Sequence, residues 1–169
     1  MPPAPVARQA VVLAESLGEG WNVQAAARMH VTLAITKDFA AGYPADVASA
    51  LETMGGRIAS APVAILLDRL SIGTESVALR PGKAIAGLTN LHRAIRREWA
   101  GTAVPWRSDW TFSPHMTLGY GREHRPVVRP IEGLGWDATE LVLIHSKVGQ
   151  TRHRTLGRWP LKAAQFELF

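Results

Sequence analysis

The sequence contains no cysteine, no long apolar run and no phosphate-binding loop of the Gly-rich type. Without cysteine the chain can form neither a disulfide framework nor a thiolate metal site, which fits the cytoplasm. No apolar run approaches the roughly 20 residues that span a bilayer. The amino-terminal stretch MPPAPVARQAV lacks the charged start and apolar core of a signal peptide. We therefore expect a cytoplasmic protein with no membrane partner.

Length and charge limit the remaining classes. The 169 residues, 47% of them hydrophobic, suffice for one compact domain or two small lobes. The formal net charge is +5, and residues 122–162 hold eight Lys or Arg against four Asp or Glu, which is 8 − 4 = +4 of that total. Such a basic segment suits a polyanion or a phosphorylated substrate. A solvated, Arg-rich surface explains the same charge nearly as well.

One four-residue unit occurs twice, 115 − 30 = 85 residues apart, as HVTL from His30 and HMTL from His115. Each copy lies in an apolar run, which predicts a strand. Residues two apart on a strand share a face, about 6.6 Å from each other. His30 and Thr32 would therefore point one way, and His115 and Thr117 would repeat that arrangement. Two such strands side by side would present two imidazoles and two hydroxyls to one cleft.

These groups are suited to phosphoryl chemistry without a metal. An imidazole titrates near neutral pH, so one ring can take a proton from water while the other gives one to a leaving oxygen. Two hydroxyls can donate to the non-bridging phosphate oxygens. A single His-x-Thr tripeptide would more often be structural, but two copies with the same apolar partners favour catalysis. No carboxylate or third histidine stands at ligand spacing beside either copy, which disfavours a metal hydrolase.

Periodicity predicts three helices and several strands around these units. The helices are expected after Pro2-Pro3, after Pro44 and after Pro81-Gly82, with apolar stripes at steps of three and four. Their stripes are, in order, Val6, Ala10, Leu13 and Leu17; Val47, Leu51, Met54 and Ile58; and Ile85, Leu88, Leu91, Ile95 and Trp99. Strands are expected at 63–72, 76–80, 139–148 and, more weakly, 154–161, with a Pro- and Arg-rich loop before residue 139. This order suggests two similar α+β lobes, each contributing one His strand.

The paired motif, with its lead-in Phe112-Ser113-Pro114-His115 and the later stretches LVLIHSKV and TLGRWPL, resembles the LigT-like 2H phosphoesterase family. The resemblance implies a single domain over 1–169 with a bilobal α+β fold, in which two antiparallel-sheet lobes carry helices outside and a cleft between them. It also implies a metal-independent RNA 2′,3′-cyclic phosphodiesterase that needs no cofactor and acts as a monomer on RNA or a nucleotide with a cyclic phosphate end. His30 would protonate the departing 3′ oxygen, His115 would activate water, and Thr32 and Thr117 would hold the phosphate oxygens.

Four further residues are candidates for substrate binding by comparison with the family. Phe112 precedes the second motif and could stack on a base. Tyr120 stands where many relatives carry an arginine, which removes a permanent cation from the phosphate end of the cleft. Arg152 and His153 lie in the basic linker, where relatives often have a tyrosine.

Two other functions remain open. One keeps the cleft but changes the substrate to a 2′,5′-linked oligonucleotide or ADP-ribose cyclic phosphate, or runs the reverse 2′-5′ ligation. The other is a non-catalytic RNA-binding module, which would not need the histidines and threonines. The family also begins with an apolar strand that this sequence does not show, so we expect residues 165–169 to pack against the first helix or the sheet; a truncated start is the alternative.

Overall fold

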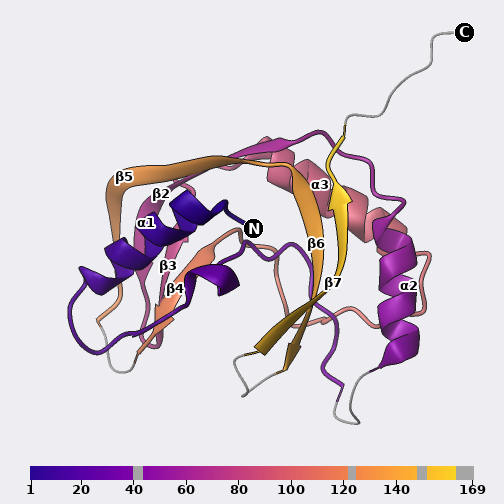
Figure 1. Cartoon of the computed structure of the whole chain (residues 1–169), viewed down its shortest axis with the longest axis horizontal. Coiled ribbons are helices and arrows are strands. Elements are labelled where there is room, and N and C mark those ends of the chain that lie inside the picture. The colour runs from indigo at the N-terminus through magenta and orange to yellow at the C-terminus, as the bar shows by residue number, and fades with distance from the viewer. Residues whose placement is uncertain (40–43, 122–124, 148–151, 163–169) are drawn as a thin grey trace, which may run out of the picture. The chain divides into compact units, whose positions relative to one another are not determined.

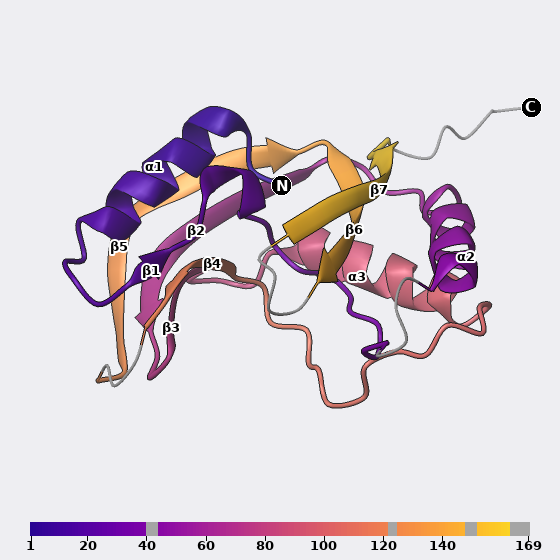
Figure 2. The ribbon, with the colours of Figure 1, turned by 60° about the horizontal axis from the view of Figure 1, so that its bottom comes forward.

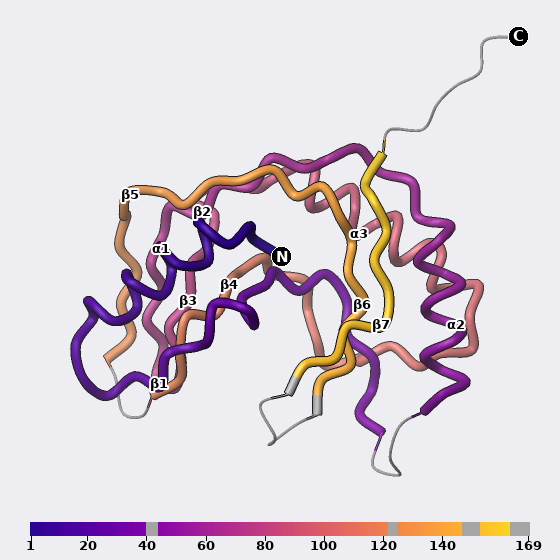
Figure 3. Tube along the Cα trace, viewed as in Figure 1, coloured from indigo at the N-terminus to yellow at the C-terminus, as the bar shows by residue number. Residues whose placement is uncertain are grey.

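The computed structural model describes residues 1–39, 44–121, 125–147 and 152–162, and the chain divides into two compact units. Unit 1 comprises Met1–Thr32, Ala64–Ile85 and Ser113–Asp137; unit 2 comprises Leu33–Val63, Ala86–Phe112 and Ala138–Phe169. Each unit is built from three separate stretches of chain, which can be followed by colour along the tube in Figure 3. Within the described ranges, no helix has the length and apolar character needed to cross a membrane.

Unit 1 is organised around a five-stranded sheet in the order β1-β4-β3-β2-β5 (Figures 1 and 2). Its strands are β1 (Asn22–Val23), β2 (Val63–Ile72), β3 (Ser76–Arg80), β4 (Met116–Tyr120) and β5 (Val127–Ala138). The pairs β1–β4, β4–β3 and β3–β2 are antiparallel. In the first half of β2, from Val63 to Leu67, buried and exposed residues alternate, as expected for a strand with one face on the core. In β4, Met116 and Leu118 are fully buried and fix that strand in the sheet.

Helix α1 (Ala4–Glu15) contacts the short 3-10 helix η1 (Ala26–Arg28) and strands β1 and β4. Its first turn contains a proline, which fits there because the first helical N–H groups have no intrahelical acceptor. The buried residues are Ala7, Ala10 and Ala14, whereas Val6 and Leu13 of the predicted stripe are half-buried. Alanine lets the helix backbone approach its neighbours closely, so the small residues rather than the large ones form the packed face.

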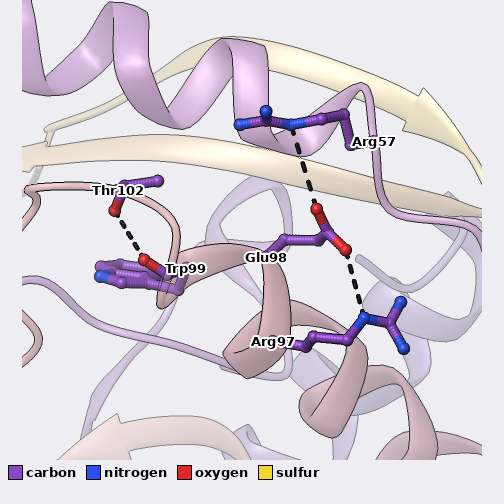
Figure 4. Close-up of polar contacts among 5 residues, drawn as sticks. All are labelled: Arg57, Arg97, Glu98, Trp99 and Thr102. Carbon is purple, nitrogen blue, oxygen red and sulfur yellow. Dashed lines mark hydrogen bonds and ion pairs between the residues drawn. The ribbon is translucent and has the colours of Figure 1, made fainter.

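Unit 2 contains α2 (Ala45–Gly55), α3 (Ala86–Trp99) and the hairpin of β6 (Glu140–Lys147) and β7 (Arg152–Pro160). Helix α2 contacts both hairpin strands and α3. Glu98, near the end of α3, lies between Arg57 at 4.0 Å and Arg97 at 3.2 Å (Figure 4). The same helix end is closed by the Thr102 hydroxyl, which donates to the Trp99 carbonyl at 2.8 Å (Figure 4). The Thr102 bond thus joins α3 to the segment that follows it, and the Arg57 ion pair joins α3 to the residues just after α2.

Most predicted elements are confirmed. Strands β2 and β3 have the predicted limits, and the α3 stripe is buried from Leu88 to Trp99. Strands β6 and β7 differ from the predicted ranges by one or two residues at each end. The α+β class with antiparallel sheets is confirmed. The predicted packing of residues 165–169 lies outside the described residues.

Three predictions were wrong. The segment predicted as a Pro- and Arg-rich loop contains the twelve residues of β5. The first motif is not in a strand, because after η1 the chain runs from Met29 to Ile35 without pairing in a sheet. The motifs are also not divided between the units: both His30-to-Thr32 and His115-to-Thr117 belong to unit 1.

Candidate active site

The first motif follows directly on η1. Met29 is 1% exposed and anchors the segment in the core, while His30 and Thr32 on either side of Val31 are half-buried. Nδ1 of His30 lies 2.7 Å from the carbonyl oxygen of Arg28. A carbonyl oxygen only accepts, so Nδ1 carries the hydrogen of this bond.

The second motif begins one residue before β4. Met116 and Leu118 are buried on one face, so His115 and Thr117 take the other face of the same extended segment. Nδ1 of His115 lies 2.7 Å from the carbonyl oxygen of Ser113. Thr117 lies opposite Ala78 of β3 in the register of the sheet.

The two histidines are therefore held in the same way. Each ring donates from Nδ1 to the carbonyl two residues earlier in the chain, at the same distance of 2.7 Å. When a ring is neutral this bond places its single hydrogen on Nδ1 and leaves Nε2 as the proton acceptor. When a ring is charged, Nε2 becomes the donor. In both rings Nε2 is therefore the nitrogen that gains or loses a proton when the ring titrates.

The pKa of His30 is lowered below its ordinary value of 6.5. Burial is the largest cause, because it disfavours the charged ring; the bond to the Arg28 carbonyl opposes it. The positive charges of the amino terminus, His115 and Arg28 lower the pKa of His30 further. The influence of His115 means that the two motifs lie close enough for their rings to interact electrostatically. Without an anion beside it, His30 favours the neutral form at neutral pH.

Two residues that the sequence analysis did not single out lie next to the second motif. Arg80, at the end of β3, donates from Nη1 to the Ser113 hydroxyl at 2.9 Å. Ser113 in turn accepts the His115 bond through its carbonyl. The signal for Arg80 was available only in part: its strand was predicted, but its neighbour across the sheet depends on which strands pair.

The four predicted substrate-binding residues have different positions. Tyr120 is at the far end of β4, opposite Asn22 and Ser76, and is 52% exposed. Phe112 belongs to unit 2, where its ring stacks on His92 with centroids 4.2 Å apart and planes 4° apart. One face of Phe112 is therefore already occupied.

The linker candidates also belong to unit 2. His153 lies in β7 opposite Ser146, and Arg152 begins that strand opposite Lys147. The side chain of Arg152 lies outside the described part of the structure. Of the predicted site residues, the two His/Thr pairs and Tyr120 thus belong to unit 1, with Tyr120 at the end of β4 opposite to the second motif. Among the described residues, no group of three or more His, Cys, Asp or Glu side chains is placed to hold a metal ion.

The antiparallel α+β fold and the paired His-x-Thr units agree with a phosphoesterase of the 2H class. The sequence matches the 2'-5' RNA ligase superfamily over residues 2–150. The chain therefore belongs to that superfamily and is LigT-like, which confirms the family resemblance. No curated protein matches the sequence.

Solved structures agree with this assignment. E. coli LigT, in its complex with 3'-AMP, is 25% identical, with a TM-score of 0.77 over 95% of this chain and 94% of its own. A structure described as a phosphoesterase is 25% identical, with a TM-score of 0.75 over 94% and 92% of the two chains. The Thermus thermophilus protein TT0787, at 19% identity and a TM-score of 0.73 over 97% and 96%, shares the fold.

Proposed function

We propose that the protein is a metal-independent RNA 2′,3′-cyclic phosphodiesterase that opens cyclic phosphate ends to 2′-phosphomonoesters. The observation that carries this proposal is the equivalent attachment of His30 and His115, each through Nδ1 to the carbonyl two residues before it. Two imidazoles with Nδ1 fixed in the same way, in electrostatic reach of each other, are suited to act as an acid–base pair. Membership of the superfamily supports phosphoester chemistry at this pair.

The proposed step breaks one phosphorus–oxygen bond. A water molecule attacks phosphorus while His115 takes its proton, the bond from phosphorus to the 3′ oxygen breaks, and His30 gives a proton to that oxygen. The order of the two roles follows the family resemblance. Thr32 and Thr117 donate to the non-bridging oxygens, whose negative charge develops in the transition state. The product keeps the phosphate on the 2′ oxygen.

Because the pKa of His30 is lowered, its role as an acid requires a nearby anion that favours the protonated ring. In the free protein the ring favours the neutral form, because it is buried and its charged neighbours are positive. A phosphate anion bound at the pair adds the opposite charge, which favours the protonated ring. We infer that His30 takes up its proton together with the anionic substrate.

The relatives support a nucleotide or RNA ligand. E. coli LigT has been solved with 3'-AMP, phosphate, ATP and NADP+. All four contain phosphate, and 3'-AMP, ATP and NADP+ also contain a nucleobase. A nucleotide with a cyclic phosphate end offers both features to the proposed site.

The test is a substrate panel with product analysis. Nucleoside 2′,3′-cyclic phosphates, RNA ending in a 2′,3′-cyclic phosphate, 2′,5′-linked dinucleotides and ADP-ribose cyclic phosphate would be incubated with wild-type protein, His115→Ala and His145→Ala. We expect a 2′-phosphate product from the first two substrates, lost in His115→Ala and kept in His145→Ala, which replaces a histidine of β6 outside both His-x-Thr motifs. Turnover confined to the other substrates would replace this proposal by the alternative phosphodiesterase. RNA binding without turnover would favour the non-catalytic module.

A further inference from the structure

Arg80 lies on the same face of the sheet as the second motif. Between β3 and β4 the register pairs Ala78 with Thr117 and Leu79 with Met116. Extending this register by one residue, past the start of β4 at Met116, brings Arg80 opposite His115. Residues directly opposite each other in an antiparallel pair share a face, as do His115 and Thr117, two apart on one strand. The Arg80 side chain therefore leaves the backbone on the same face as the candidate catalytic groups.

The charge of Arg80 is not neutralised by the described part of the protein. Its described side-chain contact is the bond from Nη1 to the Ser113 hydroxyl, and no described carboxylate lies within ion-pair distance of it. Arg69, the residue opposite Arg80 in the β2–β3 register, provides the contrast, because it is ion-paired to Asp68 at 3.1 Å. The partner of Arg69 is thus a charged carboxylate, whereas the partner of Arg80 is a neutral hydroxyl.

A single hydroxyl does not satisfy a guanidinium. The group carries five N–H donors in a planar fork, whose geometry matches two oxygens of a phosphate or carboxylate. The Ser113 hydroxyl accepts one of these hydrogens and thereby orients the guanidinium, while the Ser113 carbonyl accepts the hydrogen bond of His115. The remaining donors are available to an anion that lies against His115.

The surroundings of the histidine pair have the same sign. The fixed charges that lower the pKa of His30 come from the amino terminus and Arg28, and both are positive. Nε of Arg28 is buried and, among the described residues, has no hydrogen-bond partner. A cluster of positive groups attracts an anion, and a buried guanidinium donor gains from an acceptor oxygen supplied by a ligand.

We propose that Arg80 binds the phosphate of the substrate and, with Ser113 as its support, holds that phosphate against His115 and Thr117. This deepens the proposed function, on which it depends for the identity of the phosphate as a cyclic ester. The anion site itself depends only on the geometry of unit 1. Arg80 thereby supplies the permanent cation at the phosphate that Tyr120, at the far end of β4, does not.

The experiment measures binding of inorganic phosphate to the full chain, by calorimetry and by the NMR shifts of the histidine ring protons. The variants are Arg80→Gln, Arg80→Lys and Ser113→Ala, with Arg69→Gln as the matched control on the neighbouring strand. We expect Arg80→Gln to weaken phosphate binding about 10- to 100-fold, the scale of a charge-assisted hydrogen-bond pair. Arg80→Lys should retain part of the affinity, because the charge remains without the fork. Arg69→Gln should bind phosphate as the wild type does.

Several outcomes would overturn the proposal. One is wild-type phosphate affinity in a folded Arg80→Gln, and another is failure of the wild type to bind phosphate. A third is an equal loss of phosphate affinity in Arg80→Lys, which keeps the charge, and in Ser113→Ala, which would show that Arg80 is structural. If Arg80→Gln does not fold, the phosphate affinity of Arg80→Lys is compared with that of the wild type instead, and equal affinities would overturn the proposal. Phosphate binding through Arg80 without hydrolysis of any cyclic phosphate would reject the proposed function and leave the anion site in place. With turnover present, Arg80→Gln should raise KM more than it lowers kcat.

Discussion

Each candidate catalytic imidazole bonds to the backbone two residues before it, so the local course of the chain helps to orient the ring. Arg28 and Ser113 supply the backbone carbonyl groups, which a residue of any type at these positions would also have. This explains why the His-x-Thr repeat is recognisable in the sequence, whereas the residues that hold it are not. The sequence predicted the four motif residues as candidates, and their catalytic roles remain proposals.

Substitution of either histidine tests the acid–base pair. We expect His30→Ala and His115→Ala each to lower turnover by at least about 100-fold, the usual scale for a general acid or base. The double variant should be barely slower than either single one, because both groups act in one step. Steady-state kinetics on a cyclic phosphate would measure this. Turnover near the wild-type rate in either single variant would contradict the mechanism.

The threonine hydroxyls have a separate prediction. Valine keeps the branched shape of threonine, so Thr117→Val should retain β4 opposite Ala78 while losing one donor. If that donor acts on transition-state charge, its removal raises the activation free energy by about 2.7–4 kcal/mol. Thr32→Val should behave alike. Kinetics combined with thermal melting would separate the roles, since variants that unfold while the histidine variants stay folded would show that the hydroxyls are structural.

At the level of elements, periodicity identified strands and helices that bury one regular face. It missed β5, because Pro130 within the segment signals a loop. β5 is the last strand in the sheet order, and a proline is tolerated in an edge strand, where one row of N–H groups needs no partner. It also assigned a strand to the first motif, because an extended segment with alternating residues has the same pattern whether or not it pairs. Pairing depends on the neighbouring strand, which a local pattern does not contain.

The helix α2 gives a packing prediction in which two adjacent glycines differ. A Cβ on Gly55 would lie 2.5 Å from the Trp159 ring of β7, whereas on Gly56 the nearest atom would be the Thr53 carbonyl oxygen at 3.6 Å. We expect Gly55→Ala to lower the free energy of unfolding by about 1–3 kcal/mol, because the ring must move. Gly56→Ala should be neutral or stabilising by up to about 1 kcal/mol, since its φ of −65° suits alanine. Urea denaturation of both variants would measure this, and equal stabilities would show that Trp159 adapts without cost.

At the level of the whole molecule, the sequence predicted two lobes with one motif each, but the chain places both motifs in unit 1 and leaves that unit directly after Thr32. The 85-residue repeat describes two similar segments and does not say in which unit each one packs. That the basic segment at residues 122–162 faces a polyanion stays a prediction. Among the described residues, the guanidinium groups that the structure associates with the two histidines are those of Arg28 and Arg80, which lie outside that segment.

The stability of the whole chain should depend on pH through His30. Its pKa in the folded protein lies below the ordinary 6.5, so on acidification the unfolded chain takes up this proton first. The contribution of His30 is therefore constant above the unfolded pKa, and stability is lost as the pH falls from there through the lower folded pKa. We expect His30→Gln to lose less stability than the wild type between about pH 8 and pH 5, as measured by urea denaturation at each pH. Parallel pH dependences in the two proteins would mean that burial and the neighbouring positive charges do not disfavour the charged ring in solution.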